Sequence, residues 1–123
     1  MTAVINVTVL GSTGSIGVNT LDVIARHPDR FQIFALTART SVSDMLKQCA
    51  IHRPVYAVMD SEPHGRQLAS QLHAENVPTQ VLCGAAAIEM VAQHESVDMV
   101  MAAIVGAAGL APCLAAARTG KRL

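Results

Sequence analysis

Short apolar runs and longer segments with a helical period alternate along the chain. The runs are rich in β-branched residues, and the segments between them space apolar residues three and four apart, as one face of a helix requires. Strands are therefore predicted over residues 4–10, 31–37, 55–59, 77–82 and 97–105. Helices are predicted over residues 16–26, 85–93 and 110–119, with one more between Ser41 and Pro54 and another beginning near Pro63. Gly120 is the expected stop of the last helix.

Five strand–helix units in strict alternation predict an α/β fold. Parallel strands joined by right-handed helical crossovers give a Rossmann-like, doubly wound sheet with helices on both faces. Ser41 and Asp44 resemble a capping box at the start of the second helix. The residues expected to face the sheet are Gly17, Leu21, Ile24 and Ala25; Val42, Met45, Leu46, Cys49 and Ala50; Leu68, Ala69 and Leu72; and Ile88, Val91 and Ala92.

The turn after the first strand has the sequence LGSTGSIG, with three glycines at a spacing of three. Such a turn between a strand and a helix N-terminus is a pyrophosphate site, because unpaired N–H groups and the helix dipole favour an anion there. Gly11 allows the sharp turn, Gly14 leaves space for phosphates, and Gly17 lets the helix pack tightly on the sheet. Thr13 and Ser15 add hydroxyl donors. The alternative is a tight turn with nothing bound; a P-loop is excluded because no G-x-x-x-x-G-K-[ST] occurs.

The end of the second strand carries no carboxylate for a ribose 2′-hydroxyl. It has Arg39, Thr40 and Ser41 instead, and a guanidinium pairs with a 2′-phosphate through forked hydrogen bonds. This pattern favours NADP over NAD. The alternative is a solvated arginine beside an ordinary helix cap. The small residues of 102–112 predict space for a flat ring or ribose at the end of the fifth strand, or simply close packing of strand on helix.

No catalytic or metal-binding constellation is found in the sequence. The histidines (His27, His52, His64, His73 and His94) are scattered and most are expected to be exposed; the aspartates (Asp22, Asp29, Asp44, Asp60 and Asp98) fall on helix faces, turns and strand starts. Ser12 and Ser15 have no adjacent base. The pattern therefore predicts a cofactor site without catalytic residues and without metal ligands.

Composition narrows the class of protein further. The 123 residues are 51% apolar with a net charge of zero and no basic cluster, which argues against nucleic-acid and membrane-surface binding. Three widely spaced cysteines without a C-x-x-C motif favour a reduced, cytoplasmic protein with buried thiols. Residues 99–117 carry no charge, but two glycines and a proline interrupt them, so a strand, turn and helix are expected there instead of a membrane span.

Two stretches together resemble a known family. LGSTGSIGVNTLDV (residues 10–23) and MAAIVGAAGLAPCLAA (residues 101–116) are similar to the 1-deoxy-D-xylulose 5-phosphate reductoisomerases, and YAVMD (residues 56–60) resembles them too. The resemblance spans the whole chain. It implies an N-terminal NADPH-binding domain over residues 1–123, whose cofactor-loop residues correspond to Thr13, Gly14, Ser15 and Ile16. The family commonly has Gly-Lys-Asn where this chain has Arg39-Thr40-Ser41, so Arg39 is expected to replace the lysine's charge one residue earlier.

The resemblance also implies an activity for the whole protein. The family rearranges 1-deoxy-D-xylulose 5-phosphate and reduces the product with NADPH to 2-C-methyl-D-erythritol 4-phosphate, in the non-mevalonate isoprenoid pathway. Mg²⁺ or Mn²⁺ is held by a later domain, and the enzyme is usually a homodimer. The sequence stops at Leu123, where a sixth strand is expected to begin, so the chain alone is expected to be inactive. The alternatives are the cofactor domain of another NADP-dependent dehydrogenase and a non-catalytic nucleotide-sensing module.

Overall fold

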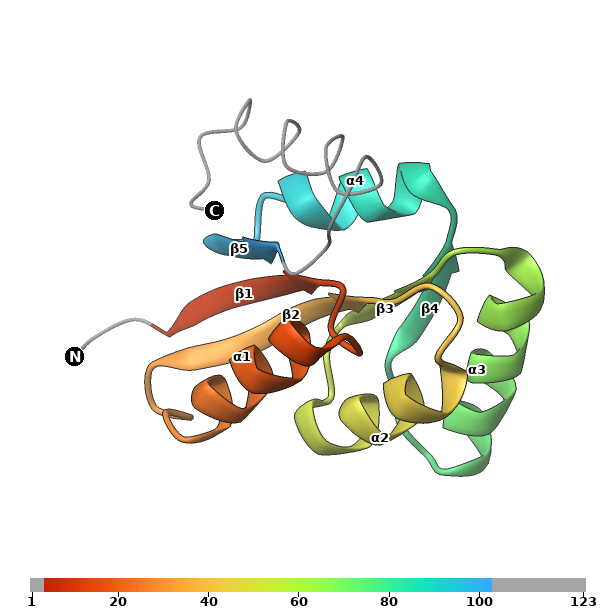
Figure 1. Cartoon of the computed structure of the whole chain (residues 1–123), viewed down its shortest axis with the longest axis horizontal. Helices are drawn as coiled ribbons and strands as arrows, with labels where there is room; N and C mark the ends of the chain where they lie inside the picture. Colours follow the sequence, from red (N-terminus) through yellow and green to blue (C-terminus); the bar gives the residue numbers. More distant parts are fainter. Residues whose placement is uncertain (1–3, 103–123) are drawn as a thin grey trace.

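The computed structural model describes residues 4–102. Five strands and four helices alternate in that part of the chain (Figure 1). The strands are β1 (Ile5–Leu10), β2 (Phe31–Thr37), β3 (Tyr56–Met59), β4 (Gln80–Cys83) and β5 (Met99–Ala102). The helices are α1 (Ser15–Ala25), α2 (Val42–His52), α3 (Glu62–Ala74) and α4 (Ala85–Gln93). The predicted helix over 110–119, its stop at Gly120 and the end of the fifth predicted strand lie outside the described residues.

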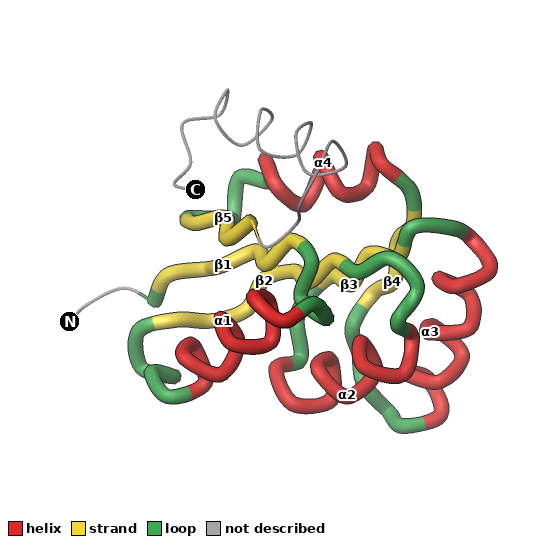
Figure 2. The backbone as a smooth tube through the Cα atoms, in the orientation of Figure 1, coloured by secondary structure: helices red, strands yellow, loops and turns green. Residues whose placement is uncertain are grey.

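All five strands are parallel and form one sheet in the order β4-β3-β2-β1-β5. The chain winds outward from β1 to β4 and then returns to the other side of β1. Helices α1, α2 and α3 lie on one face of the sheet and α4 lies on the other, which Figure 2 shows as helical layers on both sides of the strands. The predicted doubly wound, Rossmann-like sheet is therefore confirmed.

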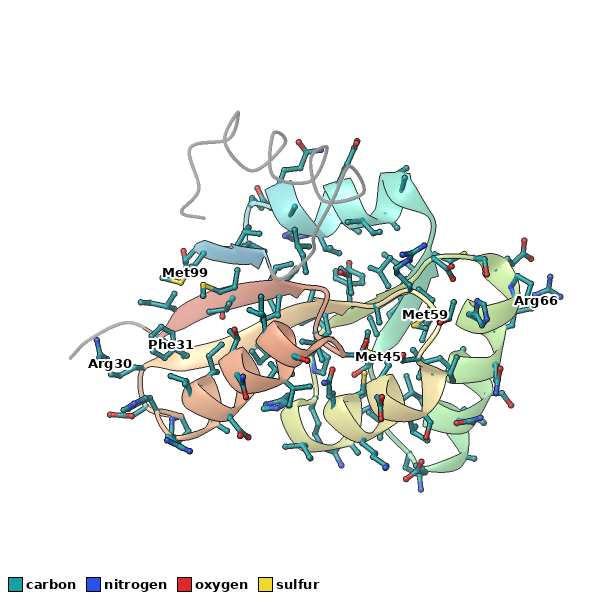
Figure 3. All side chains as sticks on the ribbon, viewed as in Figure 1. Arg30, Phe31, Met45, Met59, Arg66 and Met99 are labelled. Carbon is teal, nitrogen blue, oxygen red and sulfur yellow. The ribbon has the colours of Figure 1, made fainter. Side chains whose placement is uncertain are left out.

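The core is divided between the two faces of the sheet. Val7 and Val9 point to the side of α1–α3, while Leu10 packs with Val91 of α4 and the hydroxyl of Thr8 donates to the Val91 carbonyl at 3.0 Å. Neighbouring residues of β1 are thus buried on opposite faces, which explains why every residue from Val7 to Leu10 is buried. Met45 and Met59 lie in the core on the side of α1–α3 (Figure 3).

The structure corrects some details of the predicted elements. Strand β4 begins at Gln80 instead of residue 77, because Pro78 has no N–H to donate to the ladder and the pairing with β3 starts only at Gln80. Helix α1 ends at Ala25, one position before the predicted end. Ala25, Ala50 and Ala69 are exposed, against prediction, because only a narrow stripe of each helix contacts the sheet and their methyl groups lie beside it.

Candidate functional site

The glycine turn occupies residues 11–14, between β1 and the start of α1. Gly11 has a φ of 78°, a left-handed conformation that favours glycine, so its predicted role in the sharp turn is confirmed. A Cβ on Gly17 would lie 2.2 Å from the Gly11 carbonyl oxygen and 2.7 Å from the Ser12 Cα. The close approach that requires glycine at this position is therefore to the turn itself, and not to the sheet as predicted.

The turn lies at the point where the strand order of the sheet reverses. Strand β1 pairs with β2 on one side and with β5 on the other, and Leu10 is level with both Thr37 and Ala102. Ligands of doubly wound sheets bind outside the carboxyl ends of the strands at this kind of switch point. Ala102 opens the small-residue segment 102–112, but the rest of that segment lies outside the described residues.

Four backbone N–H groups in the turn and in the first turn of α1 have no hydrogen-bond acceptor within residues 4–102. These groups belong to Thr13, Ser15, Ile16 and Gly17, whereas the N–H of Gly14 donates to the Gly11 carbonyl at 3.3 Å. Gly14 is the N-cap of α1 and is exposed, and the first turn of the helix carries no acidic residue. Free donors at a helix N-terminus without a competing carboxylate suit a phosphate group.

The turn is held from two sides. The N–H groups of Gly11 and Ser12 both donate to the Thr37 carbonyl, at 3.0 and 2.8 Å, and the Gly11 N–H also lies 3.0 Å from the Thr37 hydroxyl oxygen. From α2, the side chain of Gln48 makes two hydrogen bonds with Ser12. Thr37 and Gln48 were not singled out from the sequence. The sequence offered one indication of this role, which is that Gln48 is a polar residue at the edge of the apolar stripe of α2.

The segment 39–41 lies beside the turn, because it follows Thr37 directly. Arg39 is exposed and makes no ion pair or side-chain hydrogen bond within residues 4–102, so its guanidinium is free to bind an anion. Its carbonyl accepts from the N–H of Asp60 at 3.2 Å. Thr40 is exposed and Ser41 is half-buried. The structure thus brings the two predicted cofactor-binding segments together at the same edge of the sheet.

The predicted capping box is wrong. Ser41 is the N-cap of α2, but its side chain makes no capping hydrogen bond within the described part of the chain. The N–H of Val42 instead donates to the Thr40 carbonyl at 2.8 Å, and Ser41 has φ −79° and ψ 70°. These values describe an inverse γ-turn, which gives Ser41 a ψ unlike that of a capping residue.

A family model of 1-deoxy-D-xylulose 5-phosphate reductoisomerase matches residues 7–123. The chain belongs to this family. Curated 1-deoxy-D-xylulose 5-phosphate reductoisomerases from Stutzerimonas stutzeri and Nitrosomonas europaea are 52% and 54% identical to it over 123 residues. The alignments cover 100% of this chain but 31% and 30% of those proteins. The chain therefore spans about three-tenths of the length of these relatives.

Solved reductoisomerase structures show the same fold. A crystal structure of the enzyme with NADPH, fosmidomycin and magnesium is 39% identical, with a TM-score of 0.92, and covers 97% of this chain and 29% of its own. A reductoisomerase from Zymomonas mobilis in complex with NADPH is also 39% identical, with a TM-score of 0.89, and covers 97% of this chain and 31% of its own.

The histidines are less exposed than predicted. His27 and His73 are exposed, whereas His52, His64 and His94 are half-buried. Burial lowers the pKa of His52, and the His94 ring lies 4.8 Å from the Phe34 ring. The Nδ1 of His64 lies 3.0 Å from a carboxylate oxygen of Asp60. All five aspartates are exposed, and no group of three or more metal-ligating side chains gathers within residues 4–102.

The two described thiols differ in environment. Cys49 is buried, and desolvation raises the pKa of its thiol to about 12, although a hydrogen bond with the Thr79 side chain opposes that rise. Cys83 is exposed, contrary to the prediction of buried thiols, because it ends the edge strand β4. Cys113 lies outside the described residues. No helix in the described part of the chain is long and apolar enough to cross a membrane.

Proposed function

We propose that the chain is the NADPH-binding part of an enzyme that converts 1-deoxy-D-xylulose 5-phosphate to 2-C-methyl-D-erythritol 4-phosphate. The observation that carries the proposal is the pairing of a turn with free N–H groups and an unpaired arginine at one edge of the sheet. Relatives at more than half identity carry the enzyme's name, and solved structures of the family hold NADPH.

The residues of the turn fit the phosphates of such a cofactor. In this proposal the N–H groups of Thr13, Ser15, Ile16 and Gly17 bind the pyrophosphate, and the hydroxyls of Thr13 and Ser15 add donors. Exposed Gly14 presents no side chain in front of the turn, so the phosphates can approach the backbone. When bound, NADPH supplies the hydride for the reduction step.

The segment after β2 fits the other end of the cofactor. Arg39 binds the 2′-phosphate with a forked pair of hydrogen bonds, and Thr40 and Ser41 lie beside it as hydroxyl donors. Because Ser41 does not cap α2 in the described residues, its hydroxyl is free for this role. The preference for NADPH over NADH then comes from the charge of Arg39.

The metal ion and the sugar-phosphate substrate are inferred from the family, and we assign their binding sites to residues outside those that the structure describes. Within 4–102 the side chains offer no metal centre, so no step through Mg²⁺ or Mn²⁺ is assigned to them. We place the metal ligands, the catalytic residues and the sugar-phosphate site in the remaining part of a full-length protein. We also infer that this protein is a cytoplasmic homodimer, on the resemblance to the family alone.

The test is the effect of Arg39→Ala on coenzyme choice in the full-length protein. Charge-assisted hydrogen bonds contribute about 1.5–3 kcal/mol, so KM for NADPH is expected to rise about 10- to 100-fold. KM for NADH should change less than about twofold, because NADH has no 2′-phosphate. The control is Arg66→Ala on α3, an exposed arginine that pairs with Glu62 at 2.9 Å, which should alter neither value (Figure 3). Equal losses for both coenzymes would contradict the assignment of Arg39.

A further inference from the structure

The side-chain amide of Gln48 joins helix α2 to the glycine turn. The Ser12 hydroxyl donates to Gln48 Oε1 at 2.7 Å, and Gln48 Nε2 donates to the Ser12 backbone carbonyl at 2.8 Å. Ser12 is fully buried and Gln48 is half-buried, so water competes little for these bonds. Both ends of one amide are therefore committed to one residue of the turn.

These bonds bear on the orientation of a free N–H group. The Ser12 carbonyl and the Thr13 N–H belong to one rigid, planar peptide group and point in opposite directions. A hydrogen bond that holds the Ser12 carbonyl toward Gln48 therefore holds the Thr13 N–H away from it. The Ser12 N–H is bound to the Thr37 carbonyl at 2.8 Å, so the peptide group on the other side of Ser12 is held as well.

The helix that carries Gln48 also begins beside the second half of the candidate site. Helix α2 starts at Val42, directly after the segment 39–41, and it lies with α1 on the same face of the sheet (Figure 1). The turn and the segment 39–41 are thus connected through one rigid element, in addition to their link through Thr37.

We propose that Gln48 is a positioning residue for NADPH, which holds the Ser12–Thr13 peptide in the orientation that binds the cofactor's phosphates. The inference rests on the proposed function and extends it to a residue that does not contact the cofactor. The bond from Nε2 to the Ser12 carbonyl is the one that orients the Thr13 N–H. The bond from the Ser12 hydroxyl only completes the pair.

The experiment compares Gln48→Leu, Ser12→Ala and Lys47→Ala in the full-length protein by steady-state kinetics and urea unfolding. Gln48→Leu removes both bonds and should raise KM for NADPH about tenfold, which corresponds to about 1.4 kcal/mol. Its kcat at saturating NADPH should stay within about twofold. Ser12→Ala keeps the Nε2 bond and should raise KM less than about threefold, and Lys47→Ala, exposed on the same helix, should leave KM unchanged.

A merely structural role gives a different result. Both Gln48→Leu and Ser12→Ala would then lower the urea midpoint, and KM for NADPH would stay at the wild-type value, which would overturn the inference. If Gln48→Leu does not fold, Gln48→Glu is the second variant, since it keeps the size and the acceptor but loses the donor to the Ser12 carbonyl. An unchanged KM in that variant overturns the inference equally. Failure of the proposed function is distinguishable, because the wild-type protein itself would then show no preference for NADPH.

Discussion

At the scale of single residues, the three glycines of the turn have different physical roles. Gly11 is required for its left-handed backbone, whereas Gly17 is required for space, because a Cβ there would meet the backbone of Gly11 and Ser12. Gly14 has an ordinary φ of −76°, and a Cβ on it would meet only the Gly11 carbonyl oxygen, at 3.7 Å. Neither backbone strain nor lack of space therefore requires glycine at position 14, although glycine is among the residues favoured at an N-cap.

Gly17→Ala and Gly14→Ala are expected to separate these roles. Gly17→Ala forces the turn away from α1 and should cost about 1–3 kcal/mol of unfolding free energy, as overpacking does. Gly14→Ala should cost about 1 kcal/mol or less, the loss expected for alanine at an N-cap, but should weaken NADPH binding at least as much as Gly17→Ala. Urea unfolding and NADPH titration of both variants measure the two effects. Equal stability losses would contradict the assigned roles.

The glycine pattern predicted the left-handed turn at Gly11 but assigned the close contact of Gly17 to the sheet instead of the turn, and nothing in the sequence singled out Gln48. A glycine pattern between a strand and a helix reports a backbone requirement directly, because few other residues meet it. A glutamine on an amphipathic helix looks the same whether it faces solvent or bonds a neighbouring turn. Its role depends on the distance between α2 and the turn, which only the packed sheet determines.

At the scale of elements, the start of α2 shows how a local turn overrides a capping signal. The spacing of Ser41 and Asp44 matches a capping box. In the γ-turn at Ser41, however, the Val42 N–H donates to the Thr40 carbonyl, and the Ser41 side chain makes no capping hydrogen bond within the described residues. The strand–helix alternation could be predicted because it depends on apolar periodicity over many residues. The cap could not, because it depends on one ψ angle imposed by the connection from β2.

Ser41→Ala should therefore destabilise the protein by less than about 0.5 kcal/mol, whereas loss of a working serine cap costs about 1 kcal/mol. The measurement is the urea midpoint, with Thr8→Val as the comparison, since the buried Thr8 hydroxyl donates to the Val91 carbonyl at 3.0 Å and its loss should be clearly measurable. A loss at Ser41 as large as that at Thr8 would show that its side chain caps α2 in solution.

At the scale of the whole molecule, the position of the candidate site follows from topology. The order β4-β3-β2-β1-β5 places β1 at the point where the winding reverses, and the turn after β1 leads into the N-terminus of α1 at that point. The fold and this position could be predicted from strand–helix alternation and one glycine pattern. No catalytic residue could be assigned from the sequence, and no group of three or more metal-ligating side chains gathers within residues 4–102. The chain spans about three-tenths of its relatives' length.

If the cofactor site and the catalytic residues lie in different parts of the protein, the 123-residue chain and the full-length protein should behave differently. If the chain holds the cofactor site, NADPH should stabilise it against urea by about 2.7 kcal/mol at one hundred times its Kd, and NADH at the same concentration should stabilise it less. The same chain should produce no 2-C-methyl-D-erythritol 4-phosphate from 1-deoxy-D-xylulose 5-phosphate, NADPH and Mg²⁺, while the full-length protein should. Arg39→Ala in the chain serves as the control, because it should remove most of the difference between the two coenzymes. Turnover by the chain alone would contradict the placement of the catalytic residues outside it, and NADPH stabilisation without turnover would support it.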